Sequence, residues 1–441
     1  MRPASRDTGD AALSESEVAA LMAPVTSARS IVLAVSGGRD SLALLATVDR
    51  WRKDRGRPEV LVVTIDHALT PDSDRVAATV ASIAAARGLR SRILRWDDPK
   101  PSTGIEAAAR QARYLLLVGA AREAAATHLL TAHSLEDQAE TLLMRLERGS
   151  GLFGLAAMRQ MIDLGGMTLF RPFLAVSRAR LAATTAAAGL TAHEDPMNAD
   201  GRFRRVRIRE LLPRLAEAGF TPASIAAAAA RLAVAADAID GAVDRLIEDH
   251  LRVDAFAVVT LSTVPFSDAP EEVRLRLLVR VLQAVGGADY PAGSEKTEAL
   301  AAALLGWEPK AKRTLAGVVI ERRGDRVRFY RESGRSLLPV LRAPPGFSGA
   351  WDSRFAIAVP ATAPEDLVVT ALGPTRPAGL VRPASLPAAA MTVLPAVFRD
   401  GRIVAVPPLG WASPETAGIV ASERVSARIA TPRRFPLAAE T

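Results

Sequence analysis

The chain has 441 residues, nearly half of them apolar, a length and composition that predict two or three packed domains. Its formal net charge of +8 favours a polyanionic partner such as a nucleic acid. The complete lack of cysteine excludes disulfides, thiolate metal sites and thiolate catalysis.

The start of the chain is polar, so Met1–Glu17 lacks the apolar segment of a signal peptide. No apolar run reaches membrane-spanning length, because Arg231 and Asp237 interrupt the alanine-rich stretch near Ile225. We therefore expect a cytoplasmic protein that does not contact a membrane.

Short β-branched runs alternate with amphipathic segments through the first 150 residues. The predicted strands are 31–35, 60–65, 90–94 and 128–132. The predicted helices are 41–51, 72–87, 105–126 and 135–147. Strands that alternate with helices of this length imply an α/β fold, a doubly wound parallel sheet. In such sheets ligands bind beyond the carboxyl ends of the strands.

The residue composition and the pattern of apolar residues change after this unit. Gly149–Gly151 resembles a hinge, a helix follows near 176–188, and 221–284 is mainly helical by its Ala/Leu periodicity. The segment 318–331 predicts a hairpin that turns at Gly324-Asp325, and the rest is rich in proline, glycine and short β-branched runs. We expect a catalytic domain at 1–215, a helical domain at 216–332 and a small β-containing domain at 333–441.

A glycine-rich turn joins the first predicted strand to the next helix. Its sequence is Ser36-Gly37-Gly38-Arg39-Asp40-Ser41. The glycines let backbone N–H groups approach an anion, and the helix N-terminus adds unpaired donors and the positive end of its dipole. Asp40 repels phosphate unless a cation lies between them, so the turn predicts a phosphate site with Mg²⁺. The structural alternative is an ordinary turn in which serine and aspartate cap the helix.

This turn resembles the phosphate loop of the PP-loop ATP pyrophosphatases, which cut ATP between its α and β phosphates and adenylate a substrate. The resemblance implies an ATP site formed by Ser36, Gly37, Gly38, Arg39, Asp40 and Ser41. It leaves the family member open, since NAD synthetases, tRNA thiolases and tRNA(Ile)-lysidine synthetases share the loop.

Two helices of the predicted catalytic domain each carry ionisable residues on one face. Glu106, Arg110 and Arg113 share a face by their spacing, although an exposed Glu–Arg ladder has the same pattern. His133, Asp137 and Glu140 share a face of the helix that begins at the ligand edge of the sheet. Capping of that helix by Ser134 and Asp137 explains two of its polar residues but not His133 or Glu140.

Six arginines lie within thirteen residues farther along the chain. They are Arg202, Arg204, Arg205, Arg207, Arg209 and Arg214. A solvated helix face is the usual outcome of a charge run, but six arginines with one glutamate exceed what solubility requires. We therefore predict a phosphate-binding surface.

Together with Arg145–Gly151 and Asp195–Asp200, these groups resemble the bacterial tRNA(Ile)-lysidine synthetase family over residues 12–215. The resemblance continues more loosely through 321–332 into the C-terminal part. Four positions depart from the usual pattern of the family: Thr70, Ser134, Met197 and Val206. These departures weaken nucleotide or tRNA roles for Thr70, Ser134 and Val206.

The resemblance implies that ATP adenylates the wobble cytidine of isoleucine tRNA with the CAU anticodon, and that the ε-amine of free L-lysine then displaces AMP. Asp40 and Asp137 would hold Mg²⁺, and Arg113 would stabilise negative charge on the phosphates. The amine must lose a proton, and His133, Asp137 and Glu140 are the candidate bases. The tRNA would contact Arg202, Arg204, Arg205, Arg207 and Arg209. A homodimer is a further association that the resemblance allows.

Three other functions stay open at this point. A tRNA thiolase generally needs cysteines or an iron–sulfur cluster, and the chain has no cysteine. A small-molecule ligase of the ammonia-dependent NAD synthetase type would not need the arginine cluster. A non-catalytic nucleotide-binding module would bind ATP without releasing pyrophosphate.

Overall fold

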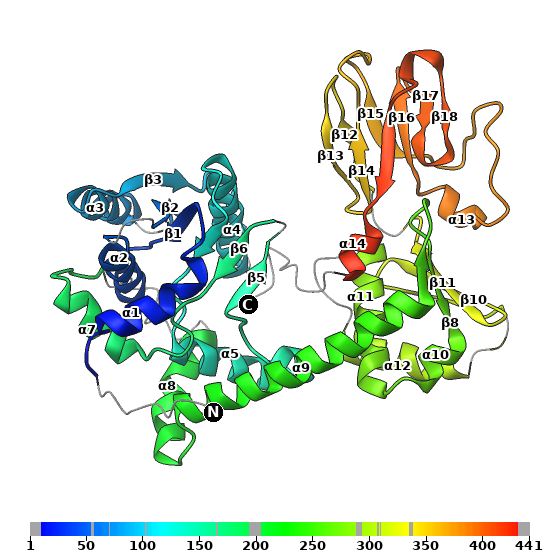
Figure 1. Ribbon diagram of the computed structural model, residues 1–441. Coiled ribbons are helices and arrows are strands. Elements are labelled where there is room, and N and C mark those ends of the chain that lie inside the picture. Colours follow the sequence, from blue (N-terminus) through cyan, green and yellow to red (C-terminus); the bar gives the residue numbers. More distant parts are fainter. Residues whose placement is uncertain are drawn as a thin grey trace. The chain divides into compact units, whose positions relative to one another are not determined.

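The computed structural model describes residues 10–53, 57–69, 71–101, 104–164, 166–193, 204–287, 293–306, 308, 310–334 and 338–430. These residues divide into two compact units, and the boundary along the chain lies between Ala236 and Asp237 (Figure 1). Each unit contains its own sheets and its own apolar clusters.

The first unit is built on a six-stranded sheet in the order β3-β2-β1-β4-β6-β5. Its strands are β1 (Ser30–Ala34), β2 (Glu59–Asp66), β3 (Arg90–Arg95), β4 (His128–Leu130), β5 (Met161–Asp163) and β6 (Thr168–Phe170). β1 pairs in parallel with β2 on one side and with β4 on the other, while β5 runs antiparallel to β6 at the edge. The chain winds outward from β1 in both directions, which confirms the predicted doubly wound α/β fold.

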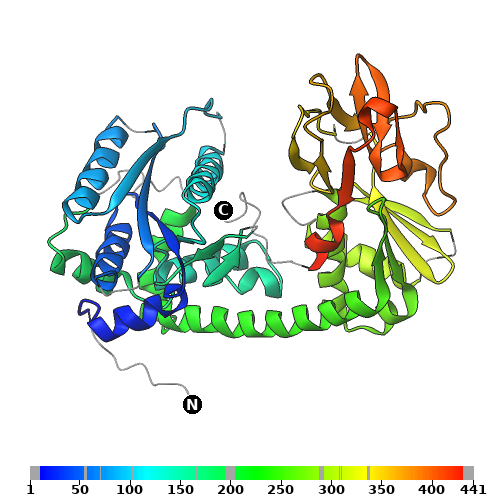
Figure 2. The same ribbon diagram turned by 45° about the horizontal axis from the view of Figure 1, so that its top comes forward.

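Helices cover both faces of this sheet (Figures 1 and 2). They include α1 (Glu15–Met22), α2 (Arg39–Trp51), α3 (Ser73–Ala86), α4 (Ile105–Glu123) and α7 (Arg178–Ala187), with the 3₁₀ turn η1 (Ala23–Val25) after α1. Ile31 and Leu33 of β1 pack with α1, α2, α3 and α7, whereas Val32 between them packs with α4. Burial on both faces explains why β1 is an uninterrupted apolar run.

Three more helices complete the first unit and lead out of it: α5 (Leu135–Glu147), α6 (Leu152–Leu155) and α8 (Arg204–Glu217). α5 has the bounds that the sequence predicts. Leu212 of α8 packs with Ala139 and Leu142 of α5 in a small apolar cluster. This contact holds α8, with its arginines, against α5. The next helix, α9 (Pro222–His250), begins in the first unit and ends in the second.

The second unit begins with helices and an antiparallel sheet in the order β7-β8-β11-β10-β9. Its elements are β7 (Leu251–Val253), β8 (Val259–Ser262), α10 (Thr263–Asp268), α11 (Glu271–Gly286), α12 (Ser294–Leu305), β9 (Lys312–Leu315), β10 (Val318–Arg323) and β11 (Arg326–Arg331). β10 and β11 confirm the predicted hairpin around Gly324-Asp325. The expectation of a mainly helical 221–284 missed β7 and β8, which are short, pair with each other, and join the sheet through the distant β11.

Two further antiparallel sheets, β12-β15-β16-β17-β18 and β13-β14-β19, confirm the expected β structure near the C-terminus. The elements are β12 (Leu341–Arg342), β13 (Ser348–Trp351), β14 (Phe355–Ala358), β15 (Val368–Ala371), α13 (Ala388–Met391), β16 (Pro395–Arg399), β17 (Arg402–Val406), η3 (Pro407–Leu409), β18 (Trp411–Ala412), η4 (Pro414–Thr416), β19 (Val420–Glu423) and α14 (Val425–Ala430). One apolar cluster runs from Val243 to Ile429 through the whole second unit. The predicted boundaries at 215/216 and 332/333 stay predictions.

By length and composition α9 could cross a membrane, and 22% of its most apolar 18-residue window is buried. Such a single helix is weak evidence, because alanine-rich helices of water-soluble proteins satisfy the same criteria. In its second half the carboxylate of Asp240 is 2.7 Å from Arg276 of α11, and Asp240 is almost fully buried. This half of α9 is therefore packed inside the second unit by an ion pair.

Replacement of Leu33 by alanine is expected to lower the free energy of unfolding of the first unit by about 3 kcal/mol, because the side chain is fully buried in β1. Ile93 in β3 is 46% exposed, so its replacement by alanine should cost less than about 1 kcal/mol. Hydrogen exchange of the β1 and β2 amides across a urea titration measures both values. Equal losses would contradict the central position of β1.

Candidate active site

Two neighbouring parallel strands end in polar segments at the same edge of the sheet. β1 leads into Ser36–Ser41, and β4 leads into Thr131–His133. The chain leaves β1 toward β2 and leaves β4 toward β6, so the connections diverge here and a crevice forms between them. The fold thus brings together the predicted phosphate turn and the predicted histidine–carboxylate group.

Hydrogen bonds within the phosphate turn fix its backbone. The Ser41 hydroxyl donates to the Gly38 carbonyl over 2.8 Å and accepts from the Ser36 amide over 3.1 Å. Gly37 has a φ of +86°, and a Cβ there would lie 2.7 Å from Cγ1 of Val76. Gly38 is the N-cap of α2 and supplies no side chain to accept from the first-turn amides. The helix N-terminus therefore keeps the donors that an anion needs, and the alternative of an ordinary serine or aspartate cap does not hold for α2.

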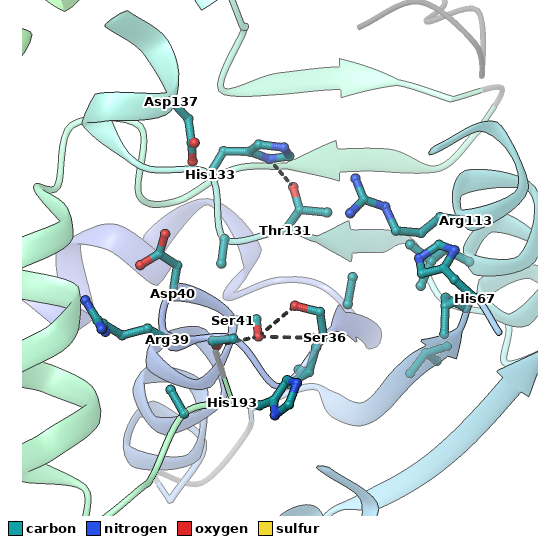
Figure 3. A pocket seen from close by; sticks show the side chains of 18 of the residues that line it. Ser36, Arg39, Asp40, Ser41, His67, Arg113, Thr131, His133, Asp137 and His193 are labelled. Carbon is teal, nitrogen blue, oxygen red and sulfur yellow. Dashed lines mark hydrogen bonds between the residues drawn. The ribbon is translucent and has the colours of Figure 1, made fainter. Parts of the chain in front are cut away.

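A cavity of about 510 Å³ lies above this edge of the sheet (Figure 3). Its polar wall contains most of the predicted site residues: Ser36, Gly38, Arg39, Asp40, Ser41, Arg113, His133, Asp137 and Arg209. Val63, Ile65 and Leu117 supply an apolar wall. A polar wall next to an apolar one suits a ligand that combines a flat base with charged phosphates.

The N-terminus of α5 holds Asp137 in a fixed position. Ser134 caps the helix, its hydroxyl accepts from the Asp137 amide, and Oδ2 of Asp137 accepts from the Ser134 amide over 2.8 Å. The expected capping box is therefore present. The other carboxylate oxygen, Oδ1, receives Arg178 at 2.5 Å and lies 3.5 Å from Arg205. Burial opposes ionisation of Asp137, but Arg205 and Arg178 outweigh it and lower the pKa of this carboxyl.

His133 precedes this helix and lines the cavity. Its Nδ1 lies 3.0 Å from Oγ1 of Thr131, so one ring nitrogen is engaged by the end of β4. Burial lowers the pKa of His133 well below its ordinary value, and the nearby Arg171 adds to this effect. The imidazole is therefore neutral at physiological pH and has a free lone pair, and the same surroundings make it a weaker base than an exposed histidine.

Glu140 lies one turn farther along α5 and is completely buried. Its Oε1 accepts from Arg178 at 2.7 Å and from Arg209 at 3.0 Å, and its Oε2 accepts from Arg205 at 2.8 Å. Burial disfavours the charged form, but Arg178 is the main influence that nevertheless lowers the pKa of Glu140. Both oxygens of this carboxylate accept from guanidinium groups, and Glu140 does not line the cavity, so its role as a candidate base stays a prediction.

Arg178 connects the phosphate turn to α5. Its three guanidinium nitrogens approach three different carboxylates: Nη2 approaches Asp137, Nη1 approaches Glu140, and Nε lies 3.7 Å from Oδ2 of Asp40. Burial and the neighbouring Asp137 raise the pKa of Asp40 to about 6, although Arg178 acts against them. Asp40 therefore has less positive charge around its carboxyl group than Asp137 and Glu140 have.

Arg178 and His193 are cavity residues that sequence reasoning missed. A signal for Arg178 exists, because it is the first residue of α7 after the capping Ser177. A cation at a helix N-terminus is unfavourable with respect to the helix dipole, so an arginine there indicates a compensating anion. His193 carried no such signal, and its backbone amide donates to the Gly37 carbonyl over 3.0 Å.

The predicted arginine surface divides into two parts. Arg205 and Arg209 turn toward Glu140, whereas Arg207 is exposed and Arg204 lies 3.6 Å from Glu147. Arg202 and the block Asp195–Asp200 lie outside the described residues. Contact of any of these arginines with tRNA stays a prediction.

Replacement of Gly37 by alanine is expected to distort the turn, because an alanine at φ +86° is strained by about 1–2 kcal/mol and meets Val76. Gly38 is the matched control, since its φ of −73° suits alanine and its nearest neighbour to a Cβ is 3.7 Å away. Faster hydrogen exchange of the turn in the free protein should occur in G37A and not in G38A. Unaltered exchange in both variants would contradict this backbone geometry.

Comparison with known proteins agrees with the geometry of the site. Residues 11–215 match the model of the PP-loop domain family. The tRNA(Ile)-lysidine synthase of Bradyrhizobium diazoefficiens is 44% identical over 346 residues, which cover 73% of this chain and 95% of that protein. The enzyme of Rhodopseudomonas palustris is 45% identical with the same coverage, and that of Ruegeria pomeroyi is 36% identical over 90% of this chain and 92% of its own length. The cavity combines a phosphate turn, a neutral histidine and paired carboxylates. Together with these relatives, it shows that the chain belongs to the tRNA(Ile)-lysidine synthase family.

Proposed function

We propose that the chain ligates free L-lysine to the wobble cytidine of isoleucine tRNA with the CAU anticodon, using ATP, and forms lysidine. The observation that carries this proposal is the convergence of the phosphate turn, His133 and Asp137 on one cavity. Membership of the family supports both the use of ATP and the reaction.

The reaction has two steps that share this cavity. The ring carbonyl oxygen of the cytidine attacks the α-phosphorus of ATP, and the bond from that phosphorus to pyrophosphate breaks. The ε-amine of lysine then attacks the ring carbon and loses a proton, and AMP departs with the former carbonyl oxygen. The phosphate turn binds the phosphates through the α2 amides, and Arg113 faces the cavity as a half-buried cation for the developing negative charge.

The carboxylates of Asp40 and Asp137 fit a site for Mg²⁺. Both approach the same guanidinium of Arg178, so their oxygens lie on one side of the cavity next to the phosphate turn. The described residues contain no group of three histidine or acidic side chains that could enclose a metal. Mg²⁺ commonly binds one or two carboxylates and completes its shell with phosphate oxygens and water. Bound there, it would neutralise phosphate charge next to Asp40.

His133 is the proposed base for the amine. Lysine's ε-ammonium has a pKa of about 10.4 in water, so a neighbouring acceptor must take its proton. Both oxygens of Glu140 accept from arginines, whereas neutral His133 lines the cavity and has only Nδ1 directed at Thr131. Asp137 also lines the cavity and carries negative charge, so it is the proposed partner of the ammonium before deprotonation.

The charge of the chain indicates its macromolecular partner. The formal net charge of +8 suits a tRNA, and Arg202, Arg204 and Arg207 are the proposed outer contacts to its phosphates. Arg205 and Arg209 instead support Glu140 from within. A cytoplasmic location and a homodimer belong to the same proposal.

Replacement of Asp137 or Asp40 by alanine is expected to lower the release of pyrophosphate by about 10²-fold or more, because each removes a carboxylate from the cavity wall. The assay supplies ATP, lysine and isoleucine tRNA, and omission of the tRNA should abolish release in the natural chain. Release that needs ammonia in place of tRNA would favour a small-molecule ligase. ATP binding without any release would favour a non-catalytic module.

Replacement of Arg178 by lysine is expected to slow adenylate formation by about 10-fold to 10²-fold, since an ammonium cannot present three nitrogens in a fixed plane to three carboxylates. Single-turnover formation of the tRNA adenylate measures the effect. Arg180→Lys is the matched control, because Arg180 lies on the same helix and pairs with Glu17 outside the cavity. Methylguanidinium should partly restore Arg178→Ala, and full activity of Arg178→Lys would refute this positioning role.

A further inference from the structure

Two carbonyl groups of the phosphate turn are held by α7 and by the segment that follows it. Oγ1 of Thr185 donates to the Arg39 carbonyl over 3.0 Å, and the His193 amide donates to the Gly37 carbonyl over 3.0 Å. Thr185 is 3% exposed and does not line the active-site cavity, whereas His193 lines it beside the turn (Figure 3). The proposed reaction assigns no role to either hydrogen bond.

Each of these carbonyls shares a peptide unit with an N–H group of the turn. The Gly37 carbonyl is joined to the Gly38 N–H, and the Arg39 carbonyl is joined to the Asp40 N–H. In a planar trans peptide unit the C=O and N–H bonds point in opposite directions. Gly38, Arg39 and Asp40 line the cavity, and the first N–H groups of a helix have no partner within that helix. Hydrogen bonds that hold the carbonyls from the α7 side therefore direct these two N–H groups toward a bound anion.

One face of α7 makes the contacts with the N-terminal part of α2. Arg178 approaches Asp40 from the first turn of α7. Leu181 and Thr185 follow on the same face by their i, i+3, i+7 spacing. Leu181 is fully buried in the apolar cluster that includes Leu42 of α2. This packing fixes the distance between the two helices, so the Thr185 hydroxyl is held within reach of the turn.

Thr185 also supports the segment that ends at His193. The Thr185 carbonyl accepts from the Leu190 amide over 3.2 Å, just after the end of α7. Leu190 and Ala192 pack against the same apolar cluster. The His193 amide reaches the Gly37 carbonyl from this anchored segment. One residue of α7 therefore supports both hydrogen bonds to the turn.

The Thr185 hydroxyl differs from that of the neighbouring Thr184 in the direction of its hydrogen bond. A threonine in a helix can donate to the carbonyl four residues earlier in the same helix. Thr184 does so, to Arg180 over 2.8 Å, and it accepts from the Leu13 amide. Thr185 instead donates across to α2. Because a buried hydroxyl without a partner is unfavourable, this bond orders the turn before any ligand binds.

We propose that Thr185 is a positioning residue for adenylation, whose hydroxyl, together with the His193 amide, orients the Asp40 and Gly38 N–H groups toward the pyrophosphate that leaves ATP. This inference rests on the proposed function, because that function places the phosphates of ATP at the turn. Donors that are oriented in advance stabilise developing charge most effectively, and a hydrogen bond to the carbonyl strengthens the N–H of the same peptide unit as a donor. The later attack of lysine on the adenylated cytidine does not use these N–H groups and is independent of Thr185.

The test uses three variants of two adjacent buried residues. Thr185→Val removes the hydroxyl at nearly constant size, and Thr185→Ser keeps the hydroxyl. Thr184→Val is the matched control, because Thr184 is 2% exposed on the same helix and bonds away from the turn. Calorimetry measures the binding of inorganic pyrophosphate with Mg²⁺ to the free protein. Single-turnover adenylate formation and the KM for lysine are measured on isoleucine tRNA.

Thr185→Val should weaken pyrophosphate binding and slow adenylate formation about 3-fold to 10-fold each, which corresponds to the loss of one hydrogen bond. The KM for lysine should stay unaltered, and Thr185→Ser should restore both losses. Thr184→Val should bind pyrophosphate as the natural chain does. If Thr185→Val does not fold, Thr185→Ala removes the same hydroxyl and repeats the comparison.

Three results would overturn the proposal: natural pyrophosphate affinity without the Thr185 hydroxyl, equal losses in Thr184→Val, or no restoration by Thr185→Ser. The second and third would indicate that packing of α7, rather than the hydroxyl, supports the turn. Pyrophosphate binding requires neither tRNA nor lysine, so it tests Thr185 separately from the reaction. A natural chain that binds pyrophosphate but forms no lysidine would instead refute the proposed function.

Discussion

The buried carboxylate of Glu140 is the constraint on which the active site depends. A charge without solvent is stable only when it is paired and hydrogen-bonded, and this carboxylate has three guanidinium partners. Arg178 comes from α7, and Arg205 and Arg209 come from α8, so one carboxylate on α5 holds two other helices in position. Removal of the carboxylate would leave three arginines close together without their shared anion.

The same network connects structure to chemistry. Arg178 also reaches Asp137 and Asp40, so the position of α5 and the position of the phosphate turn are set by one side chain. Three carboxylates face three arginines here, and the arginines do not stabilise the charged form of each carboxylate equally. Asp137 and Glu140 stay ionised, whereas Asp40 is held less firmly in its charged form and has the most to gain from a cation. His133, beside them, is kept neutral by burial and by nearby arginines.

Local patterns in the sequence were sufficient for the first four strands of the first unit and the helices between them, whereas α1, β5, β6 and α8 were not predicted. The apolar run of β1, the glycines after it and the capping residues of α5 each act over a few residues, and the structure places all of them as predicted. β7 and β8 were missed because three- and four-residue strands have little pattern of their own; β7 pairs only with β8, and β8 depends on pairing with the distant β11. The orientation of Arg205 and Arg209 could not be predicted either. A run of arginines has the same composition whether it faces solvent or a buried glutamate 65 residues away in the chain.

The central claim is that this cavity joins ATP to the carbonyl oxygen of a nucleobase and that an amine then displaces AMP. Isoleucine tRNA that carries a heavy oxygen isotope at that carbonyl of the wobble cytidine tests it most directly. After reaction with ATP and lysine, mass spectrometry should find the heavy atom in AMP and the lysine-bearing base without it. Heavy oxygen retained in the modified tRNA, or lost to water while AMP stays light, would contradict the account.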